Sequence, residues 1–531
     1  MTKSLKILFL LTLALSLLMG GCQRPAVPTS QPTPAASETP PPTKDPTETK
    51  APAATKPPTV TPAPSSTPEP LVQATATLRS LPDAAPLQEG WWRTAVFYEI
   101  FVRSFKDTDG DGIGDFNGIT QMLDYLNDGD PSTTTDLGVT GLWLMPIFPS
   151  PSYHGYDVTD YLAANPQYGT LDDFKYLLSE AHRRGIGVIL DFVINHTSTQ
   201  HAWFQAAQDP ASPLRDYFIW SETNPGYLGP WGQQVWYPGE SGYYYAIFWD
   251  QMPDLNFRNP AVTQEIFNAA SFWLKEVGVD GFRIDAAQHL IEEGQVQANT
   301  EATHTWFKEF RKAYKADNPT AMVVGEVWSS SDETAKYLQG DELDLTIHFD
   351  LAAAWVDGIG LGIPDEINAI YREELAPNPQ LLYGTFLTNH DMNRAMHVFY
   401  RDAAKARLAA TLLLTSPGVP FLYYGEEIGM SGAKPDEDIR RPMQWSDAEN
   451  AGFSRTTPWN EPFMDYTTVN VATEDADPAS LLNHYRALVH MRQELPALNS
   501  GELIPVDSRN GRIVAFQRQS GESCYLVVAN L

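Results

Sequence analysis

Residues 281–289, "GFRIDAAQH", carry the strongest clue to the architecture of this 531-residue chain. An apolar strand leads into Arg283, and Asp285 follows two positions later. In a strand, residues i and i+2 lie on the same face, so we expect both charged side chains on one side of a buried strand. Burying a charge is costly unless it is paired. The motif therefore indicates either a structural ion pair or a carboxylate that is held ionised for chemistry.

Seven further apolar runs accompany this one, most of them separated by helical stretches or longer insertions. They are "AVFYEIFVRSF" from residue 95, "GVTGLWLMPIF" from 138, "GIGVILDFVINH" from 185, "AMVVGEVW" from 321, "LDLTIHFDL" from 343, "LLYGTFLTNHD" from 381 and "GVPFLYYGEEIG" from 418. Near-continuous apolar strands that alternate with helices indicate a parallel sheet buried on both faces. Eight such units predict an α/β fold with a closed (β/α)8 TIM barrel over residues 91–498. A doubly wound open sheet is the structural alternative.

Polar residues gather where four of these runs end. They are Asn195 and His196, Arg283 and Asp285, Glu326, and His390 with Asp391. Active sites of such barrels lie at the C-terminal ends of the strands and combine residues from several of them. One charged strand end is unremarkable, but four in register predict a catalytic site rather than core packing.

Two regions depart from the barrel pattern. Residues 197–258 are irregular and aromatic, and an insertion of this length in a compact domain is usually functional, so we predict a small inserted subdomain after the third strand. The last barrel helix is predicted over 481–498. The segment 499–531 then contains "GRIVAFQRQSGESCYLVVANL", which looks like two β-strands. It predicts the start of a C-terminal all-β domain that is cut short.

The N-terminal residues predict where the protein resides. Two lysines precede an apolar run, residues 7–19, that is too short to span a bilayer but fits the core of a signal peptide. The run ends in "LMGGC", which resembles a bacterial lipoprotein box, so we predict a lipoprotein signal peptide over 1–22 with lipid on Cys22. An ordinary cleaved signal peptide is the alternative. Residues 23–88 are rich in Pro and Thr and predict a disordered tether. The expected location is extracytoplasmic, lipid-anchored to the bacterial cell membrane or secreted.

Composition limits the possible partners. The formal net charge is −30, which is the wrong sign for binding a phosphate backbone, so we expect no nucleic-acid partner. The chain has two cysteines, Cys22 and Cys524, at opposite ends, so no disulfide framework is expected. We expect a monomer that meets the membrane only through its N-terminal lipid.

Five separated motifs resemble those of the α-amylase family, glycoside hydrolase family 13. They are "DFVINH" (191–196), "MPDLN" (252–256), "GFRIDAAQH" (281–289), "VGEVW" (324–328) and "FLTNHD" (386–391). The resemblance covers residues 91–531, and "MPDLN" is similar to members between the oligo-1,6-glucosidase and neopullulanase groups. It implies a retaining mechanism in which Asp285 is the nucleophile, Glu326 is the general acid/base, and Asp391 is a third carboxylate that grips sugar hydroxyls.

The resemblance changes the interpretation of "GFRIDAAQH". We expect the Arg283 guanidinium to lower the pKa of Asp285 and to fix its orientation. Glu326 lies between Gly325 and the apolar Val327, a setting that should raise its pKa and keep it protonated. With the other motifs present, the catalytic interpretation displaces the purely structural ion pair.

The resemblance also implies which residues bind the sugar. They are His154, Tyr156, Asp157, His196, Arg283, His390 and Arg394. The first three lie in "YHGYDVTDY" (153–161) and match the first sugar pocket, whereas Arg394 matches an arginine that some α-glucosidase-like members place near it. A metal centre is the competing interpretation of a His, Asp and Glu cluster, but no paired-histidine spacing such as HExxH supports it.

An acidic loop follows the first apolar run. In "DTDGDGIGD" (107–115), aspartates alternate with glycines, and hard oxygen ligands at every second position suit Ca²⁺. An EF-hand is not predicted, because the twelfth position from Asp107 is Gly118 and not Glu. The family has a similar calcium loop, which implies as ligands Asp107, Asp109, Asp111, the carbonyl of Ile113, and Asp115. A solvated acidic turn is the alternative.

The expected activity is retaining hydrolysis of mainly α-1,4-glucosidic bonds in starch-derived glucans or malto-oligosaccharides. In the family a bulky Val after the nucleophile accompanies α-1,6 specificity, whereas Ala286 leaves room here. "RRPMQW" (440–445) resembles members that act on oligosaccharides. Two alternatives stay open. One is a 4-α-glucanotransferase or other transglycosylase with the same two carboxylates, and the other is a non-catalytic surface protein that binds glucan.

Overall fold

The computed structural model describes residue 81 and residues 85–531. The predicted signal peptide, the lipidation of Cys22 and nearly all of the predicted tether lie outside the described residues. Within them, no helix is both long and apolar enough to cross a membrane.

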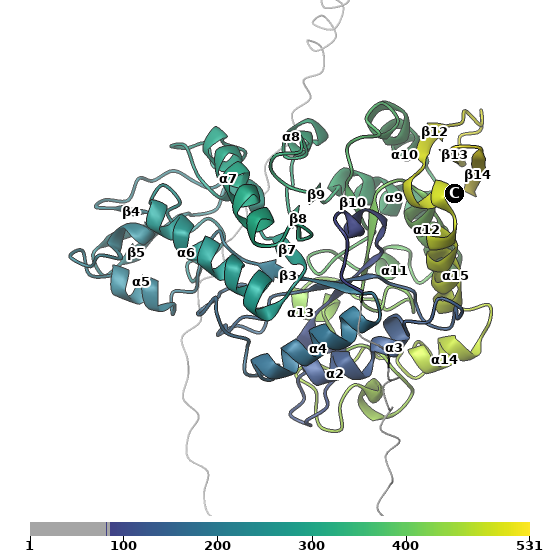
Figure 1. The fold of residues 1–531 in the computed structure, drawn as a ribbon, viewed down its shortest axis with the longest axis horizontal. Helices are drawn as coiled ribbons and strands as arrows, with labels where there is room; N and C mark the ends of the chain where they lie inside the picture. Colours follow the sequence, from purple (N-terminus) through teal and green to yellow (C-terminus); the bar gives the residue numbers. More distant parts are fainter. Residues whose placement is uncertain (1–80, 82–84) are drawn as a thin grey trace, which may run out of the picture. The chain divides into compact units, whose positions relative to one another are not determined.

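Eight parallel strands form the central sheet (Figure 1). They are β1 (Phe97–Ile100), β2 (Gly141–Leu144), β3 (Gly187–Phe192), β7 (Gly281–Ile284), β8 (Met322–Gly325), β9 (Leu345–Thr346), β10 (Gly384–Thr385) and β11 (Val419–Tyr423). Their order is β10-β11-β1-β2-β3-β7-β8-β9, and an isolated parallel bridge between Ile347 and Gly384 joins the two outer strands. The sheet therefore closes into a (β/α)8 barrel, as predicted, and the open-sheet alternative is wrong.

Helices pack around the barrel and also lie in the segments that connect its strands. The longer ones are α4 (Leu171–Arg183), α6 (Pro260–Ser271), α7 (Glu301–Asp317), α9 (Phe349–Leu361), α12 (Ala403–Thr415) and α15 (Leu481–Glu494). The shorter ones are α1 (Val102–Phe105), α2 (Phe116–Gln121), α3 (Leu123–Leu126), α5 (Ala202–Ala207), α8 (Ser331–Lys336), α10 (Asp365–Ile370), α11 (Ala395–Val398), α13 (Asp436–Ile439), α14 (Val471–Ala476) and α16 (Pro496–Ser500). Helix α4 begins with a capping box, in which Thr170 and Asp173 satisfy each other's backbone N–H groups.

Strand register brings the residues of the predicted site to one level. Asp191 of β3 pairs with Arg283 of β7. Ile284, the last residue of β7, pairs with Gly325, the last residue of β8. Asp285 and Glu326 are the next residues along each chain, so both leave the barrel side by side at its C-terminal end.

The insertion after β3 contains a small antiparallel sheet of its own. Its strands are β4 (Trp220–Ser221), β5 (Trp236–Gly239) and β6 (Gly242–Tyr245), in the order β4-β6-β5. An isolated bridge between His196 and Asp254 links the two ends of the insertion. The segment thus leaves and re-enters the barrel at one point, beside the C-terminal end of β3.

The last part of the described chain is a three-stranded antiparallel sheet. It consists of β12 (Glu502–Pro505), β13 (Ile513–Ser520) and β14 (Ser523–Asn530). Two of these strands were predicted, and β12 was missed because its short sequence has no alternating pattern. The helix predicted over 481–498 divides into α15 and α16 at Leu495, because the following Pro496 disfavours a helical conformation at the residue before it.

Candidate active site

Arg283 lies at the centre of the site. Its guanidinium group donates from Nη1 to Oδ1 of Asp285 at 2.7 Å and from Nη2 to Oε2 of Glu326 at 2.8 Å. Nη1 also donates to Oδ1 of Asp191 at 2.8 Å. The side chain is only 2% exposed. One buried cation therefore orients three carboxyl groups. The ion pair of Arg283 with Asp285 and the pair of carboxyl groups are parts of the same cluster.

Burial raises the pKa of both Asp285 and Glu326, and Arg283 opposes this in each. The expected lowering of the Asp285 pKa is wrong in net direction, because the loss of solvent outweighs the guanidinium. The pKa of Glu326 is raised as predicted, and the negative charge of Asp285 raises it further. Retaining glycoside hydrolysis needs one protonated carboxyl group beside one oriented carboxylate, and the raised pKa of Glu326 favours the protonated role for it.

Asp191 is a member of the cluster that was quoted in a motif but given no role. Its Oδ2 accepts a hydrogen bond from the Tyr156 hydroxyl at 3.0 Å and one from the Trp143 indole at 3.3 Å. Burial raises its pKa to about 7, against the pull of Arg283. Asp191 is fully buried, so it positions Arg283 and Tyr156 from behind and does not reach the substrate.

His390 is held between two acids. Its Nδ1 lies 2.5 Å from Oε1 of Glu99, and its Nε2 lies 2.9 Å from Oδ2 of Asp391. Burial lowers the pKa of His390, but Asp391 and Glu99 outweigh this and raise it to about 10. The imidazole is therefore a cation at neutral pH. The Tyr156 ring stacks on it at 5.5 Å between centroids and 14° between planes, which fixes both rings.

Asp391 is paired on its other side with Arg440. Nη2 of Arg440 donates to Oδ1 of Asp391 at 2.9 Å, and its Nε donates to the His390 carbonyl at 2.9 Å. Burial raises the pKa of Asp391, yet the charges of His390 and Arg440 outweigh it and hold that pKa well below its usual range. Asp391 is thus an ionised carboxylate that lines the cavity and can accept hydrogen bonds. Asp436 completes the group, with Oδ2 3.1 Å from Arg440.

Arg394 does not line the cavity into which Asp285, Glu326 and Asp391 open, which corrects its predicted place in the sugar pocket. Its Nη1 donates to the Tyr424 carbonyl at 2.7 Å and its Nε to the Ile439 carbonyl at 2.8 Å. The guanidinium also lies over the Tyr423 ring, 4.2 Å from its centroid. Arg394 therefore holds backbone segments together beneath the site. The arginine that contacts the third carboxylate is Arg440, from the motif "RRPMQW".

The remaining predicted sugar-binding residues divide into two groups. His154, Tyr156 and His196 line the cavity. Burial lowers the pKa of His196 to about 4 and that of His154 below its usual range, so both rings are neutral at pH 7. Asp157 is buried and does not line the cavity, because its carboxylate accepts hydrogen bonds from the hydroxyls of Ser150, at 2.5 Å, and Ser152.

Asp285, Glu326 and Asp391 open into a cavity of about 650 Å³. It is lined by His154, Tyr156, His196, Trp231, Phe248, Trp249, Met252, Asp285, Ala286, Gln288, His289, Glu326, Trp328, Asp391, Asp436 and Arg440. Charged and polar residues come mainly from the barrel strand ends, and exposed aromatic residues come from the inserted subdomain and from the segment after β8. A cavity of this kind suits a ligand that has both hydroxyl groups and apolar faces.

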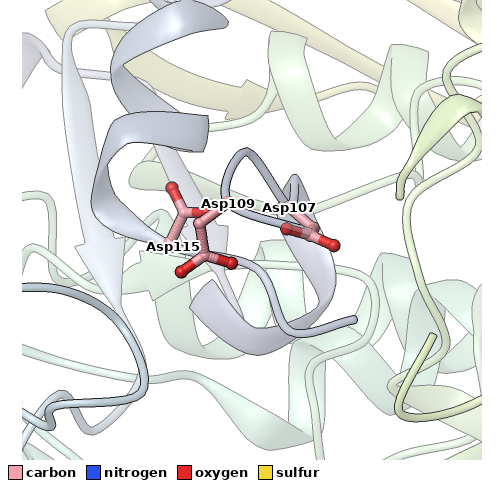
Figure 2. A group of neighbouring side chains, drawn as sticks. All are labelled: Asp107, Asp109 and Asp115. Atoms are coloured by element: carbon pink, nitrogen blue, oxygen red, sulfur yellow. The ribbon is translucent and has the colours of Figure 1, made fainter. Parts of the chain in front are cut away.

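The acidic loop brings together three of its four aspartates. Carboxylate oxygens of Asp107, Asp109 and Asp115 lie within 4.8 Å of one another, and Figure 2 shows the three side chains on the loop after α1. Asp111 is outside this group, because its Oδ1 accepts the Ile113 N–H at 2.7 Å and so turns back on its own loop. Three clustered carboxylates fit a hard cation. The predicted set of calcium ligands, which included Asp111, is not brought together as a whole.

No role was predicted from the sequence for several residues that the structure places in the site. Asp191 and Glu99 are single acids inside otherwise apolar strand runs, where an unpaired charge would be costly. Asp436 and Arg440 lie outside every strand motif, and only the fold brings them to the cavity.

Comparisons with known proteins agree with this geometry. Residues 99–501 match the family model "Alpha amylase, catalytic domain". The chain is 41% identical over 452 residues to "Alpha-amylase 3" of Dictyoglomus thermophilum, covering 83% of this chain and 86% of that protein. It is 33% identical over 511 residues to a "Glucan 1,6-alpha-glucosidase" of Streptococcus pneumoniae, covering 84% and 92%. The crystal structure of an alpha-amylase from H. orenii superposes with a TM-score of 0.77 at 44% identity, covering 82% of this chain and 89% of that one. The chain therefore belongs to the α-amylase family of glycoside hydrolases.

Proposed function

We propose that the protein is a retaining α-glucan hydrolase that cleaves mainly α-1,4-glucosidic bonds in malto-oligosaccharides or starch-derived glucans. The observation that carries this proposal is the Arg283 cluster, in which one buried guanidinium orients Asp285 and Glu326 at adjacent strand ends. Retaining enzymes need two such carboxyl groups about 5 Å apart, one nucleophilic and one protonated.

The residues supply each step of a double displacement. Glu326 donates its proton to the glycosidic oxygen while a carboxylate oxygen of Asp285 attacks C1 of the donor sugar, and the leaving sugar departs with that proton. Glu326 then removes a proton from water, whose oxygen attacks C1 and releases Asp285. Asp391 accepts hydrogen bonds from donor-sugar hydroxyls, and cationic His390 adds positive charge beside it.

The preference for α-1,4 bonds is supported by the small side chain next to the nucleophile. Ala286 lines the cavity and leaves space where a larger residue would narrow it. The named relatives point in both directions, since one is called an α-amylase and another a glucan 1,6-α-glucosidase.

A time course on two substrates tests the proposal. We expect maltoheptaose to be converted to shorter products at least about tenfold faster than isomaltotriose, a difference that pocket fit alone can supply. Faster cleavage of isomaltotriose would overturn the α-1,4 assignment. Unchanged maltoheptaose over a long incubation would leave only glucan binding.

We propose in addition that Asp107, Asp109 and Asp115 bind Ca²⁺ and that the ion stabilises the fold. A matched pair of variants tests this, because Asp111 lies on the same loop but outside the cluster. Adding Ca²⁺ to chelator-treated protein should raise the melting temperature of the parent and of Asp111→Asn, through binding to the native state. Asp109→Asn should lose most of this rise. An equal response from Asp109→Asn would exclude the assigned ligands.

We also propose that Cys22 carries lipid and anchors the enzyme outside the cytoplasmic membrane. The support is the sequence "LMGGC" followed by a Pro- and Thr-rich segment. Stable retention requires more than one acyl chain, which a diacylated cysteine provides. In a bacterial host the parent should fractionate with membranes and Cys22→Ser should not. Soluble parent protein in the medium would indicate an ordinary secretion signal.

A further inference from the structure

Two buried arginine residues lie close together where α12 and α15 meet the C-terminal sheet. Arg492 of α15 and Arg518 of β13 are each 1% exposed. Burial and the neighbouring Arg518 lower the pKa of Arg492 to about 9, and burial lowers the pKa of Arg518 to about 10. Both guanidinium groups therefore remain cations at neutral pH. A buried charge is costly unless another charge compensates it.

Both guanidinium groups donate hydrogen bonds to backbone carbonyls, at distances between 2.6 and 2.9 Å. The acceptors are the carbonyls of Leu414, Ser416 and Gly418 for Arg492, and those of Thr415 and Gly501 for Arg518. These contacts fasten the end of α12, the start of β11 and the segment after α16 to one another.

The carbonyl groups do not neutralise the two cations. The C-terminal end of α12 is the negative end of a helix dipole, which is equivalent to roughly half an elementary charge. Two guanidinium ions exceed this by more than one charge. In the part of the chain that the structure describes, neither Arg492 nor Arg518 forms an ion pair with a carboxylate. The compensating charge must therefore come from elsewhere.

A cavity of about 70 Å³ adjoins Arg518. Its lining includes Tyr383 and Thr385 at the start of β10, Pro417 and Gly418 just before β11, and residues 499–503. Strands β10 and β11 begin here, whereas the residues of the active site follow strand ends, so this cavity lies at the opposite end of the barrel. One water molecule occupies roughly 30 Å³ in the liquid, so the cavity has room for a small ion.

Three buried polar atoms on residues that line this cavity have no hydrogen-bond partner among the described residues. They are Nε of Arg518, Oγ1 of Thr385 and Oδ1 of Asn499. The first two can donate to an anion, and Asn499 can do so through its NH₂ group after a half turn of the amide. Glu502 is the one acid among the lining residues, and it is exposed. Uncompensated positive charge, unpartnered polar atoms and a small space therefore occur together.

We propose that this cavity binds one small inorganic anion, of the size and charge of chloride, and that the ion helps to hold the C-terminal sheet on the barrel. The anion accepts hydrogen bonds from Nε of Arg518 and from the Thr385 hydroxyl, and its charge offsets the two guanidinium ions. Because Arg518 belongs to β13 and Thr385 to β10, the ion joins the two parts of the fold. The inference concerns stability, and it is independent of the proposed reaction at Asp285 and Glu326.

Melting curves at constant ionic strength test the proposal. Sodium gluconate, whose anion is too large for the cavity, is replaced stepwise by sodium chloride. Over about a hundredfold rise in chloride, the melting temperature of the parent should increase by about 2 °C or more, because the ion binds the native state. A parent whose melting temperature does not respond to chloride would overturn the proposal.

Matched variants identify the site. Arg518→Gln should lose the response to chloride, whereas Arg512→Gln, at an exposed arginine just before β13, should keep it. Because Arg518→Gln also loses contacts with carbonyls, two milder variants retain both buried arginines. Thr385→Val removes one donor and should lose about half of the response or more. Asn499→Asp places a fixed carboxylate in the cavity, so it should melt at a higher temperature in low chloride and no longer respond to the ion.

Bromide locates the ion directly, because it has the same charge as chloride and scatters X-rays anomalously. Crystals of the parent soaked in bromide should show an anomalous peak beside Arg518 and Thr385, and crystals of Asn499→Asp should show none there. Absence of the peak in the parent would overturn the proposal. Equal chloride responses in the parent, Arg518→Gln and Asn499→Asp would also overturn it, since they would reveal a general effect of salt.

Discussion

One side of the cavity, called here the donor side, has Arg283, His390 and Arg440, which are buried and each contact a carboxyl group. The aromatic side has Trp231 and Trp328, which are more than half exposed. The donor side is a network of fixed charges, with heavy-atom distances of 2.5 to 3.1 Å. Such a network leaves little freedom in where a sugar ring can sit. The aromatic side offers flat apolar surfaces but no directional hydrogen bonds, so a sugar ring stacked there is free to slide and rotate.

This difference separates what each side controls. A substitution on the donor side should reduce turnover of every substrate, because it disturbs groups that act in the transition state. A substitution on the aromatic side should change which substrates are preferred.

Asp285→Asn should abolish turnover. An amide is nearly the same size as the carboxylate but cannot form the glycosyl-enzyme, so we expect a loss of more than about a thousandfold in kcat, or roughly 4 kcal/mol of barrier. The measurement is the initial rate on maltotetraose together with α-glucosyl fluoride. Both substrates should fail equally, since the step that forms the intermediate is common to them.

Asp191→Asn provides the matched control for this variant. Asp191 bonds to the same Nη1 of Arg283 but does not line the cavity. Its effect should be indirect and smaller, about tenfold in kcat. If Asp191→Asn were as inactive as Asp285→Asn, the two acids could not be separated into a nucleophile and a positioning residue.

The sequence predicted the barrel and the place of Asp285 and Glu326 side by side at strand ends, because both depend on local patterns. Asp285 and Glu326 follow apolar strands directly, and parallel strands in register place such residues together. The pKa of Asp285 was mispredicted, because a residue pattern shows its charged neighbour but does not show how completely water is excluded. Arg394 was misplaced because a loop arginine can reach in many directions, and only the path of the chain shows that Arg440 is the one facing Asp391.

Two equivalent substitutions test whether Arg440, and not Arg394, is the arginine that acts in the site. Arg440→Lys keeps a charge but loses the planar fork that bonds Asp391 and the His390 carbonyl together, so kcat/KM for maltotetraose should fall about tenfold to a hundredfold. Arg394→Lys removes contacts with backbone carbonyls and should mainly lower the melting temperature. A larger activity loss in Arg394→Lys than in Arg440→Lys, measured on folded protein, would reverse the correction.

The charge on His390 predicts a pH-dependent contribution to stability. Its folded pKa of about 10 lies above the usual value near 6.5, so the contribution is complete below pH 6.5 and is lost as the pH rises through 10. The parent should therefore exceed His390→Gln by a few kcal/mol in the free energy of unfolding at pH 7, and by less at pH 9.5. Urea unfolding at the two pH values measures this difference.

His484 supplies the control, because burial lowers its pKa. A histidine whose pKa is lowered by folding contributes stability that is gained as the pH rises through about 6.5 and is then constant. The difference between the parent and His484→Gln should not change between pH 7 and 9.5. A constant difference for His390→Gln as well would mean that His390 is neutral in the native protein.

The smallest expected effect concerns the residue after the nucleophile. Ala286 has φ 50° and ψ 34°, a left-handed conformation in which a Cβ atom is unfavourable, and its N–H donates to Oε2 of Glu326 at 3.1 Å.

Ala286→Gly removes the strain but adds freedom to the unfolded chain, so we expect a gain of roughly 0.5 kcal/mol in the free energy of unfolding. Ala287→Gly, one position later and without a positive φ, should instead lose about 1 kcal/mol or more. Because the more flexible glycine backbone of Ala286→Gly would hold the N–H that contacts Glu326 less firmly, kcat should fall slightly, by about twofold. Opposite signs of the two stability changes, measured by urea unfolding, would place a strained backbone between the charged donor side and the aromatic side, whereas equal losses would show that Ala286 carries no strain.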